Sequence, residues 1–384
     1  MSRRFPFGPQ RDSGTFIVGT RVELLTEPVL AFDAMIREID QAKHQVLLEM
    51  YWFASDTVGW RFCEHLCQAA ARGVWVAVMY DALGSWDTDE ALFETLRAAG
   101  VEVIEYGPIA PWRRRFAWRR LSLRDHRKIL VVDGKVGFTG GLNLSKESLP
   151  VAAGGDGWRD DAVRLEGPAV AALADCFWQT HRRERGRQTM HPHVSEAAPV
   201  ADAAMVRVLS QNGPRRRYQI LSAYLERIRG AKQRVWLKNA YFIPDRRVRK
   251  ALSEAARRGV DVRVVVPMKS DVPIAKYAGQ RTFGGLMRNG VRLFAWLPSV
   301  LHSKTAVVDG LWSTVGTFNL DHMSFRTNLE VNVGVLDAGF AQQMEASFLA
   351  DLEQCREIVL SEFERRSFVE RSVEFFLYQF RRFL

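Results

Sequence analysis

The feature that most constrains the fold is an internal duplication, because the same succession of apolar and turn-forming segments occurs twice. Residues 45–107 contain three strand-like apolar segments separated by helix-like segments that end near Gly73 and Gly100. Residues 234–298 repeat this order, with Gly259 and Gly290 at the corresponding helix ends. Glycine is common just after a helix, where the backbone turns left-handed. Strands that alternate with helices predict an α/β fold with a largely parallel sheet.

Each copy continues into a nearly identical signature, "DHRKILVVDGKVGFTGGLN" and "LHSKTAVVDGLWSTVGTFN". His126 and His302 are 176 residues apart, and so are Asp133 and Asp309. The runs "ILVV" and "TAVV" are apolar and β-branched, which is typical of strands buried on both faces. The Asp-Gly pair that follows each run predicts a hairpin turn. Two matched copies indicate two half-sites of a single pocket around a pseudo-twofold axis.

The residue types of this pocket suit phosphodiester chemistry. Alternate side chains on a strand share a face, so each histidine would lie beside a lysine, and each asparagine would return on the next strand. Lysine and asparagine can hold the phosphoryl oxygens and stabilise transition-state charge. One neutral imidazole can attack phosphorus while the other protonates the leaving oxygen. The candidate phosphate ligands are Lys128, Lys304, Asn143 and Asn319.

A nucleophilic histidine also needs its far ring nitrogen anchored, usually by a carboxylate. Asp160 and Glu330 are the candidates, and each follows the histidine of its own copy, by 34 and 28 residues. We expect no metal or cofactor. Cys63 and Cys67 are four residues apart, but no second ligand pair accompanies them with the spacing of a metal site.

Two HxKxxxxD motifs with a trailing Gly and Asn resemble the phospholipase D superfamily. "WRDDAVRLEGPAV", "AYFIPD" and "GTFNLDHMSFRTNLEVN" resemble its bacterial cardiolipin synthase branch. The resemblance runs from about residue 20 to the C-terminus. It implies two tandem α/β/α sandwich halves related by a pseudo-twofold axis, with the active site between them.

The resemblance also implies roles for individual residues. His126 would be the nucleophile that forms a phosphatidyl-histidine, and His302 the acid–base partner. Asp133 and Asp309 belong to the catalytic motif, although their place at a strand end suggests a structural role. Thr317 keeps a hydroxyl where a serine commonly follows the glycine.

The activity that the branch implies is transfer of a phosphatidyl group from one phosphatidylglycerol to another, with release of glycerol. A phospholipase D that hydrolyses phospholipids is the first alternative, and a metal-independent nuclease is the second. Transferase and hydrolase differ only in the hydroxyl that reaches the phosphoenzyme, so the motifs leave this choice open.

The chain divides into five expected parts. These are an N-terminal tail (1–19), a first domain (20–186), a polar Pro-containing linker (187–204), a second domain (205–366) and a C-terminal amphipathic helix (367–384). Longer members of the branch begin with transmembrane segments. This chain has no uncharged apolar run of 18 residues, so it resembles the soluble, membrane-associated type.

Residues 111–124, "PWRRRFAWRRLSLR", form an insertion of the first copy, which is 14 residues longer than the second at this point. Arginine with interleaved tryptophan can bind single-stranded nucleic acid or the headgroups of an anionic membrane. A solvated surface loop is the third interpretation. We expect a membrane-facing loop, and its candidate lipid-binding residues are Trp112, Arg113, Arg114, Arg115, Trp118, Arg119 and Arg120.

The C-terminal segment "SFVERSVEFFLYQFRRFL" has its apolar residues on one helical face and arginines around it. It is either an interfacial helix or a helix packed on the second domain.

With 54 Lys and Arg against 44 Asp and Glu, the chain favours an anionic partner. Two basic, aromatic elements favour a membrane surface and phosphatidylglycerol over nucleic acid. Four unpatterned cysteines indicate a reducing compartment, so we expect a peripheral protein on the cytoplasmic side of the bacterial inner membrane.

Overall fold

The computed structural model describes residues 15–112, 116, 121–185, 197–201, 203–211 and 218–381. The first half of the chain comprises β1 (Ile17–Leu25), α1 (Pro28–Gln41), β2 (Gln45–Met50), α2 (Thr57–Ala71), β3 (Trp75–Asp81), α3 (Glu90–Ala98), β4 (Glu102–Tyr106), β5 (Lys128–Val132), β6 (Val136–Gly140), the 3₁₀ turns η2 (Lys146–Ser148) and η3 (Val151–Ala153), β7 (Ala162–Glu166) and α4 (Val170–Arg185).

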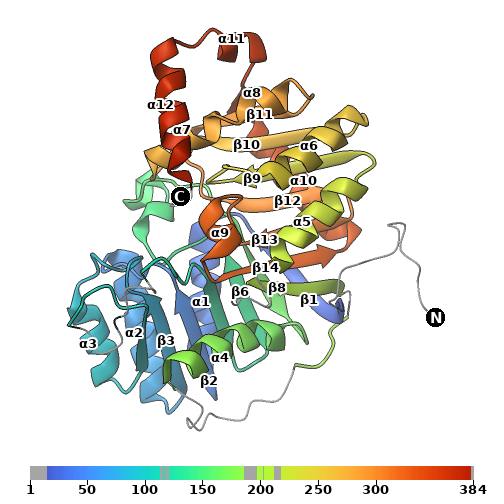
Figure 1. Cartoon of the computed structure of the whole chain (residues 1–384). Helices are drawn as coiled ribbons and strands as arrows, with labels where there is room; N and C mark the ends of the chain where they lie inside the picture. The colour runs from blue at the N-terminus through green and yellow to red at the C-terminus, as the bar shows by residue number, and fades with distance from the viewer. Residues whose placement is uncertain are drawn as a thin grey trace.

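The second half comprises β8 (Ala204–Gln211), α5 (Gln219–Gly230), β9 (Arg234–Asn239), α6 (Arg246–Arg257), β10 (Asp261–Lys269), α7 (Pro273–Gln280), α8 (Phe283–Met287), β11 (Arg292–Val300), β12 (Lys304–Val308), β13 (Trp312–Gly316), α9 (His322–Arg326), β14 (Glu330–Leu336), α10 (Ala338–Glu353), β15 (Cys355–Glu357), α11 (Leu360–Glu364) and α12 (Phe368–Gln379). In Figure 1 the blue-to-green half lies below the yellow-to-red half.

The strands form one 15-stranded sheet in the order β15-β11-β10-β9-β12-β13-β14-β8-β1-β7-β6-β5-β2-β3-β4. Outward from β1 and β8, the strands of the two sides correspond in the same order, apart from the additional edge strand β15 of the second half, which confirms two halves about a pseudo-twofold axis. β1 joins the halves, because it pairs with β8 near Ile17 and with β7 from Arg21 onward. The predicted tail 1–19 therefore overlaps the start of a strand.

The expectation of a largely parallel sheet is wrong. β2, β3 and β4 are parallel to one another, and β9, β10 and β11 likewise. The other neighbours inside each half are antiparallel. The reason is the Asp-Gly turn, where Asp133 and Gly134 have φ angles of 49° and 63°. Left-handed residues at both turn positions close a tight hairpin, so β5 and β6 run antiparallel.

Apolar clusters cover the sheet and join the halves. α1, α2 and α3 pack on the first half, and α5, α6 and α8 pack on the second. A third cluster contains side chains from both halves, including Leu173 and Phe177 of α4 and Met344 and Phe348 of α10. The two copies are therefore one body with a shared core.

Several predicted features lie partly or wholly outside the described residues. They are the tail up to residue 14, most of the linker, Arg113, Arg114, Arg115, Trp118, Arg119, Arg120 and residues 382–384. In the part of the chain that is described, no helix combines the length and apolar content needed to cross a bilayer.

Candidate active site

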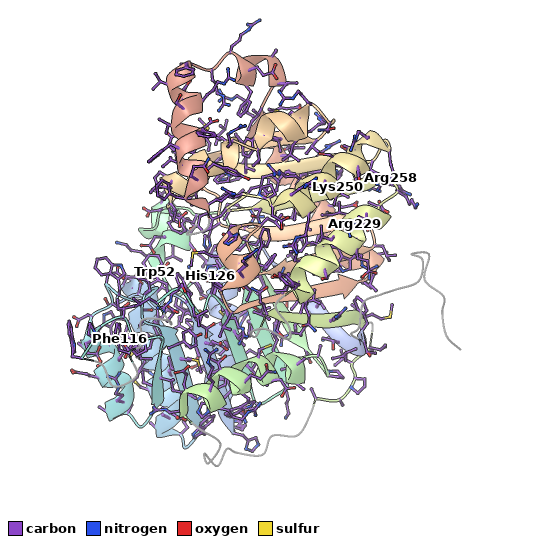
Figure 2. The ribbon with its side chains drawn as sticks, in the orientation of Figure 1. Trp52, Phe116, His126, Arg229, Lys250 and Arg258 are labelled. Carbon is purple, nitrogen blue, oxygen red and sulfur yellow. The ribbon has the colours of Figure 1, made fainter. Side chains whose placement is uncertain are left out.

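The two histidines lie where the halves meet. His126 precedes β5 and His302 precedes β12, and Figure 2 shows His126 at the junction between the lower and upper halves. Lys304, from the second half, is one of the groups that lower the pKa of both His126 and Lys128. The half-sites are therefore close enough to share one electrostatic environment, as the duplication predicts.

Each histidine is held by the opposite half. The backbone N–H of His126 donates to the carbonyl of Leu329 at 3.0 Å, and its Nδ1 lies 3.1 and 3.2 Å from the carboxylate oxygens of Glu330. The N–H of His302 donates to the carbonyl of Arg159 at 2.8 Å. Its Nδ1 lies 2.6 Å from Oδ2 of Asp160.

This crossed arrangement corrects the expected pairing of each carboxylate with the histidine of its own copy. Asp160 follows His126 in the sequence but anchors His302, and Glu330 anchors His126. The physical reason is the pair of short bridges between the halves, Asp125 to Leu329 and Arg159 to Leu301. They bring each acid beside the other copy's catalytic strand.

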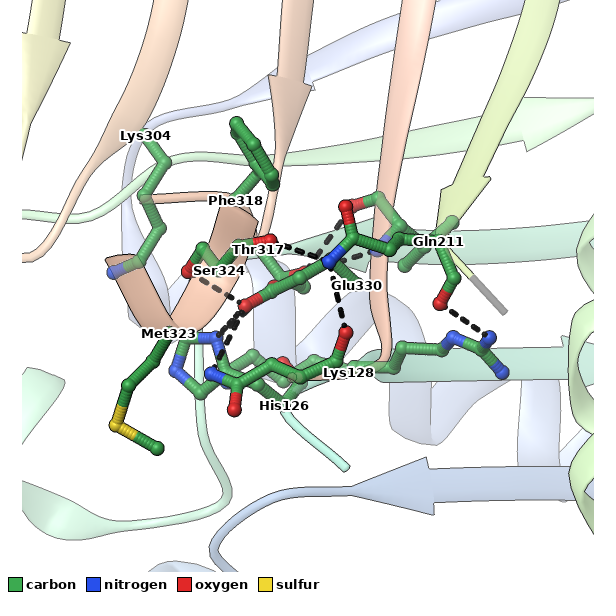
Figure 3. Close-up of polar contacts among 12 residues, drawn as sticks. His126, Lys128, Gln211, Lys304, Thr317, Phe318, Met323, Ser324 and Glu330 are labelled. Carbon is green, nitrogen blue, oxygen red and sulfur yellow. Dashed lines mark hydrogen bonds and ion pairs between the residues drawn. The ribbon is translucent and has the colours of Figure 1, made fainter. Parts of the chain in front are cut away.

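Glu330 is surrounded by hydrogen-bond donors. Ser324 donates its hydroxyl at 2.8 Å, and the hydroxyl of Thr317 donates to the second carboxylate oxygen. Figure 3 shows Glu330 between these hydroxyls and the ring of His126. Burial alone would raise the pKa of Glu330, but His126, Thr317 and Lys128 outweigh it and the pKa is lowered. Glu330 is therefore an anion at neutral pH.

Asp160 has a different environment. Burial raises its pKa to about 7, against the charge of Lys304 and the backbone N–H of Asp161, which donates at 2.8 Å. A Cβ at Gly141 would lie 2.0 Å from Oδ1 of Asp160. The second copy has Thr317 at the position of Gly141. In the second half this position supplies a hydroxyl that donates to Glu330, and in the first half the absence of a side chain makes room for the carboxylate of Asp160.

The bases of the pocket are shifted toward their neutral forms. Burial and Lys128 lower the pKa of His126, and burial and Lys304 lower that of His302 well below its ordinary value. Burial and Lys304 lower the pKa of Lys128 to about 7. Bringing an anion between the two ammonium groups would offset this repulsion. Neutral imidazoles between two lysines match a site for nucleophilic attack on a phosphodiester.

Asn143 and Asn319 lie in the loops that follow β6 and β13, beyond the strands on which we expected them. Both are buried, and their side-chain oxygens have no hydrogen-bond partner among the described residues. Buried amides normally find partners, so these two groups have unused hydrogen-bonding capacity next to the histidine-bearing strands.

Asp133 and Asp309 are at the other end of these strands, away from the histidines. The Asp133 carboxylate accepts the backbone N–H groups of Lys43, His44 and Gln45 at 2.8–2.9 Å. Asp309 accepts those of residues 232–234 in the same way. These contacts favour the structural role suggested by their position over a catalytic one, and the catalytic assignment stays a prediction.

Three aromatic residues border the histidines and were not predicted. The Tyr51 ring centroid is 5.0 Å from that of His126 and 5.1 Å from Nζ of Lys128. Trp158 and Tyr241 lie 5.6 and 6.4 Å from His302. The repeated aromatics in "MYWF" and "NAYF" after the first strand of each copy could have identified the two tyrosines.

The described part of the 111–124 insertion is limited. Trp112 is 84% exposed. Figure 2 shows Phe116 beside α3, at the outer edge of the first half and away from His126. Arg124 is buried, where its guanidinium donates to the carbonyl of Gly107 at 3.1 Å and lies 3.4 Å from Asp81. The last arginine of the stretch is thus part of the fold, and the lipid-binding role of the other residues stays a prediction.

Comparison with known proteins shows which family the chain is similar to. A family model described as "Cardiolipin synthase, PLD-like domain" matches residues 35–179 and 224–352. The cardiolipin synthase of Geobacillus thermodenitrificans is 34% identical over 359 residues, which cover 93% of this chain and 71% of that protein. Cardiolipin synthase A of Pseudomonas putida (strain W619) is 36% identical over 347 residues, covering 89% and 70%.

Among solved structures, the phosphatidylserine synthase of Haemophilus influenzae Rd KW20 superimposes with a TM-score of 0.73 at 12% identity. The alignment covers 97% of this chain and 98% of that one. At this identity the likeness concerns the fold, and it extends over both halves.

Proposed function

The chain belongs to the cardiolipin synthase family of phospholipase D-like proteins, and we propose that it transfers a phosphatidyl group from one phosphatidylglycerol to a hydroxyl of another. Glycerol is the leaving group of the first step. The observation that carries the proposal is the crossed pair of histidine–carboxylate contacts, His126 with Glu330 and His302 with Asp160. Their different environments suit two different roles.

His126 is suited to be the nucleophile. Its lowered pKa keeps the imidazole neutral, while the anionic Glu330 fixes Nδ1 and stabilises the positive charge that develops on attack. Nε2 of His126 attacks phosphorus and the phosphorus–oxygen bond to the glycerol headgroup breaks. Lys128, Lys304 and the Nδ2 groups of Asn143 and Asn319 would donate to the non-bridging oxygens.

The His302–Asp160 pair is suited to be the acid and base. Burial raises the pKa of Asp160 to about 7, so the pair retains one proton near neutral pH. This proton passes through His302 to the departing glycerol oxygen. In the second step His302 takes the proton of the acceptor hydroxyl, which attacks phosphorus and releases His126. Environments that separate the pKa values of two carboxylates commonly separate the acid from the nucleophilic partner.

The positive charge of this mechanism comes from lysines, so we propose that activity needs no divalent cation. Two buried ammonium groups take the place that a metal has in other phosphoryl-transfer sites. Activity of the purified protein in excess EDTA is expected to equal that in buffer. Loss in EDTA that one added metal restores would contradict this part of the proposal.

We also propose that the protein acts at the surface of the membrane that contains its substrate, on the cytoplasmic side. Its net charge of +10 favours anionic lipid. The lipid substrates that the family implies reside in a bilayer.

The deciding experiment is incubation of the protein with phosphatidylglycerol and separation of the lipid products. Cardiolipin and glycerol in equal amounts are expected. Phosphatidic acid as the main product would instead identify a hydrolase. His126→Ala and His302→Ala, each checked for folding by circular dichroism, should abolish turnover, and near wild-type activity in either would contradict the shared site.

A further inference from the structure

The C-terminal helix α12 presents apolar side chains to solvent. Phe368 is 83% exposed and Phe376 is 61% exposed, and Val369, Val373, Phe375 and Phe380 are also exposed. The helix residue that is buried is a charged one, Glu374, at 3% exposure. A surface helix of a soluble protein normally turns its apolar side toward the core. α12 has the opposite arrangement.

α12 is nevertheless held firmly by its other side. The guanidinium of Arg366 pairs with Glu374 and lies 3.3 Å over the ring of Phe363, which in turn stacks on Phe283 of α8 at 6.0 Å. Tyr378 packs beside α7 in the small cluster of Ile243, Ala275 and Ala278. The side of α12 that contains Glu374 and Tyr378 therefore packs on the second half of the chain, as one of the two interpretations of this helix expects. That interpretation leaves the exposed apolar side unexplained.

A cavity of about 600 Å³ lies beside this helix, between α8, α11 and α12. Its lining includes four arginines, two glutamates and two phenylalanines of α12, which are Arg281, Arg288, Arg366, Arg371, Glu364, Glu374, Phe368 and Phe375. Arg288 is paired with Glu364 at 2.8 Å and Arg366 with Glu374. The guanidiniums of Arg281 and Arg371 form no hydrogen bond or ion pair among the described residues, although the charge of Arg281 acts against the burial that raises the pKa of Glu374. Two such groups facing one cavity match the oxygens of a phosphate.

We propose that α12 docks the protein on an anionic bilayer and that this cavity binds the phosphate of an anionic phospholipid, outside the catalytic pocket. The exposed phenylalanines enter the boundary between headgroups and acyl chains, and the arginines pair with headgroup phosphate. A phospholipid offers both chemistries at this spacing, because its phosphate adjoins its acyl chains. The proposal rests on the proposed function, which puts the substrate in a bilayer.

This docking surface is linked to the catalytic pocket. Tyr378 of α12 packs in the same cluster as Tyr241, whose ring is 6.4 Å from His302. The Tyr241 hydroxyl donates to Asp271, just before α7. Figure 1 shows α12 standing beside α7 at one edge of the molecule, on the side opposite α6. The packed side of α12 is therefore connected to the His302 half-site through Tyr378 and Tyr241, while its exposed side is the one that would meet the lipid.

The test compares binding of the full chain to phosphatidylcholine vesicles with and without phosphatidylglycerol. One variant combines Phe368→Ser with Phe376→Ser, and another combines Arg281→Gln with Arg371→Gln. Each is expected to weaken binding to the anionic vesicles by about tenfold or more, and to lower activity on vesicles in proportion. Activity on phosphatidylglycerol in detergent micelles should stay within about twofold of wild type, because the catalytic groups are untouched.

Two matched controls carry the same kinds of change elsewhere. Val18→Ser alters an apolar side chain of β1 that is 65% exposed. Lys250→Gln removes a charge from α6, at the right of Figure 2 and on the side opposite α12. Both should bind vesicles like wild type. All variants should keep the melting temperature of wild type, since the changed side chains are at the surface.

Vesicle binding needs no turnover, so it is also measured in the His126→Ala protein. Unchanged binding in the phenylalanine variant, or equal losses in the controls, would overturn the docking helix. Unchanged binding in the arginine variant would overturn the headgroup cavity. If the wild-type protein binds neither kind of vesicle, the docking proposal is wrong and a protein partner becomes the expected occupant of the apolar face. Wild-type binding without cardiolipin formation would overturn the proposed function alone.

Discussion

At the scale of single residues, the two halves of the site are alike in motif and different in electrostatics. Glu330 accepts hydroxyl donors and is held as an anion, whereas burial raises the pKa of Asp160 to about 7. The difference begins at one position, Thr317 in one copy and Gly141 in the other. A side chain at Gly141 would collide with Asp160, so the copies are not interchangeable.

Glu330→Gln should lower the rate of phosphatidyl-histidine formation by on the order of 10²- to 10⁴-fold, as when an orienting carboxylate is removed from other catalytic imidazoles. The amide cannot stabilise an imidazolium, and it permits the wrong tautomer. Single-turnover measurements on the folded variant would check this. Ser324→Ala, which removes one donor from Glu330 at 2.8 Å, is the milder control. A rate within threefold of wild type in Glu330→Gln would show that His126 does not depend on this carboxylate.

The rate on a soluble phosphodiester should have a narrow pH optimum close to neutrality. As pH falls, protonation of His126 removes the nucleophile, and because its pKa is lowered this limb lies below pH 6.5. As pH rises past about 7, Lys128 loses its charge and the His302–Asp160 pair loses its proton. Initial rates at low substrate concentration, which report the free enzyme, would check both limbs. An optimum above pH 9 would contradict these assignments.

At the scale of the elements, the Asp-Gly hairpins fix β5 and β12 at the end that lies away from the histidines. Asp133 adopts a positive φ of 49° and its carboxylate accepts three backbone N–H groups of residues 43–45. The contact ties the β5–β6 turn to the start of β2. Asp309 makes the same tie in the second half, so the aspartate of each signature fixes the strand whose other end adjoins the histidine.

Asp133→Ala should therefore lower the free energy of unfolding by about 2–4 kcal/mol, because it leaves the N–H groups of residues 43–45 without their acceptor and puts alanine in the left-handed region. Asp133→Asn should lose less, since asparagine tolerates positive φ and can accept part of the contacts. Urea unfolding, with activity measured on the folded protein, would separate the two effects. Wild-type stability together with lost turnover in Asp133→Ala would favour the catalytic assignment.

At the scale of the whole molecule, the two copies are one body. A single sheet runs through both, β1 bridges β7 and β8, and one apolar cluster contains α4 and α10. Each histidine receives its backbone acceptor and its carboxylate from the other half. Neither half alone contains a complete histidine site.

Cleavage of the chain between the halves should leave most of the activity. With a protease site introduced in the predicted linker 187–204, the nicked fragments are expected to elute together and to keep most of the turnover, because the sheet and shared core hold them. Size-exclusion chromatography and activity on the same fractions would check this. Fragments that separate without denaturant would mean that the interface is weaker than its core suggests.

The sequence by itself determined the duplicated α/β plan, the buried strands, the helix ends, the paired histidines and the candidates for phosphate-binding residues. These depend on local spacing and on residue chemistry, which a single chain displays directly. Tertiary structure decided which carboxylate anchors which histidine, because the bridges at Leu329 and Leu301 join residues far apart in sequence. It likewise decided that Asp133 binds backbone behind the site, and which side of α12 faces solvent. Periodicity identifies the two faces of a helix, but only packing determines which one the fold covers.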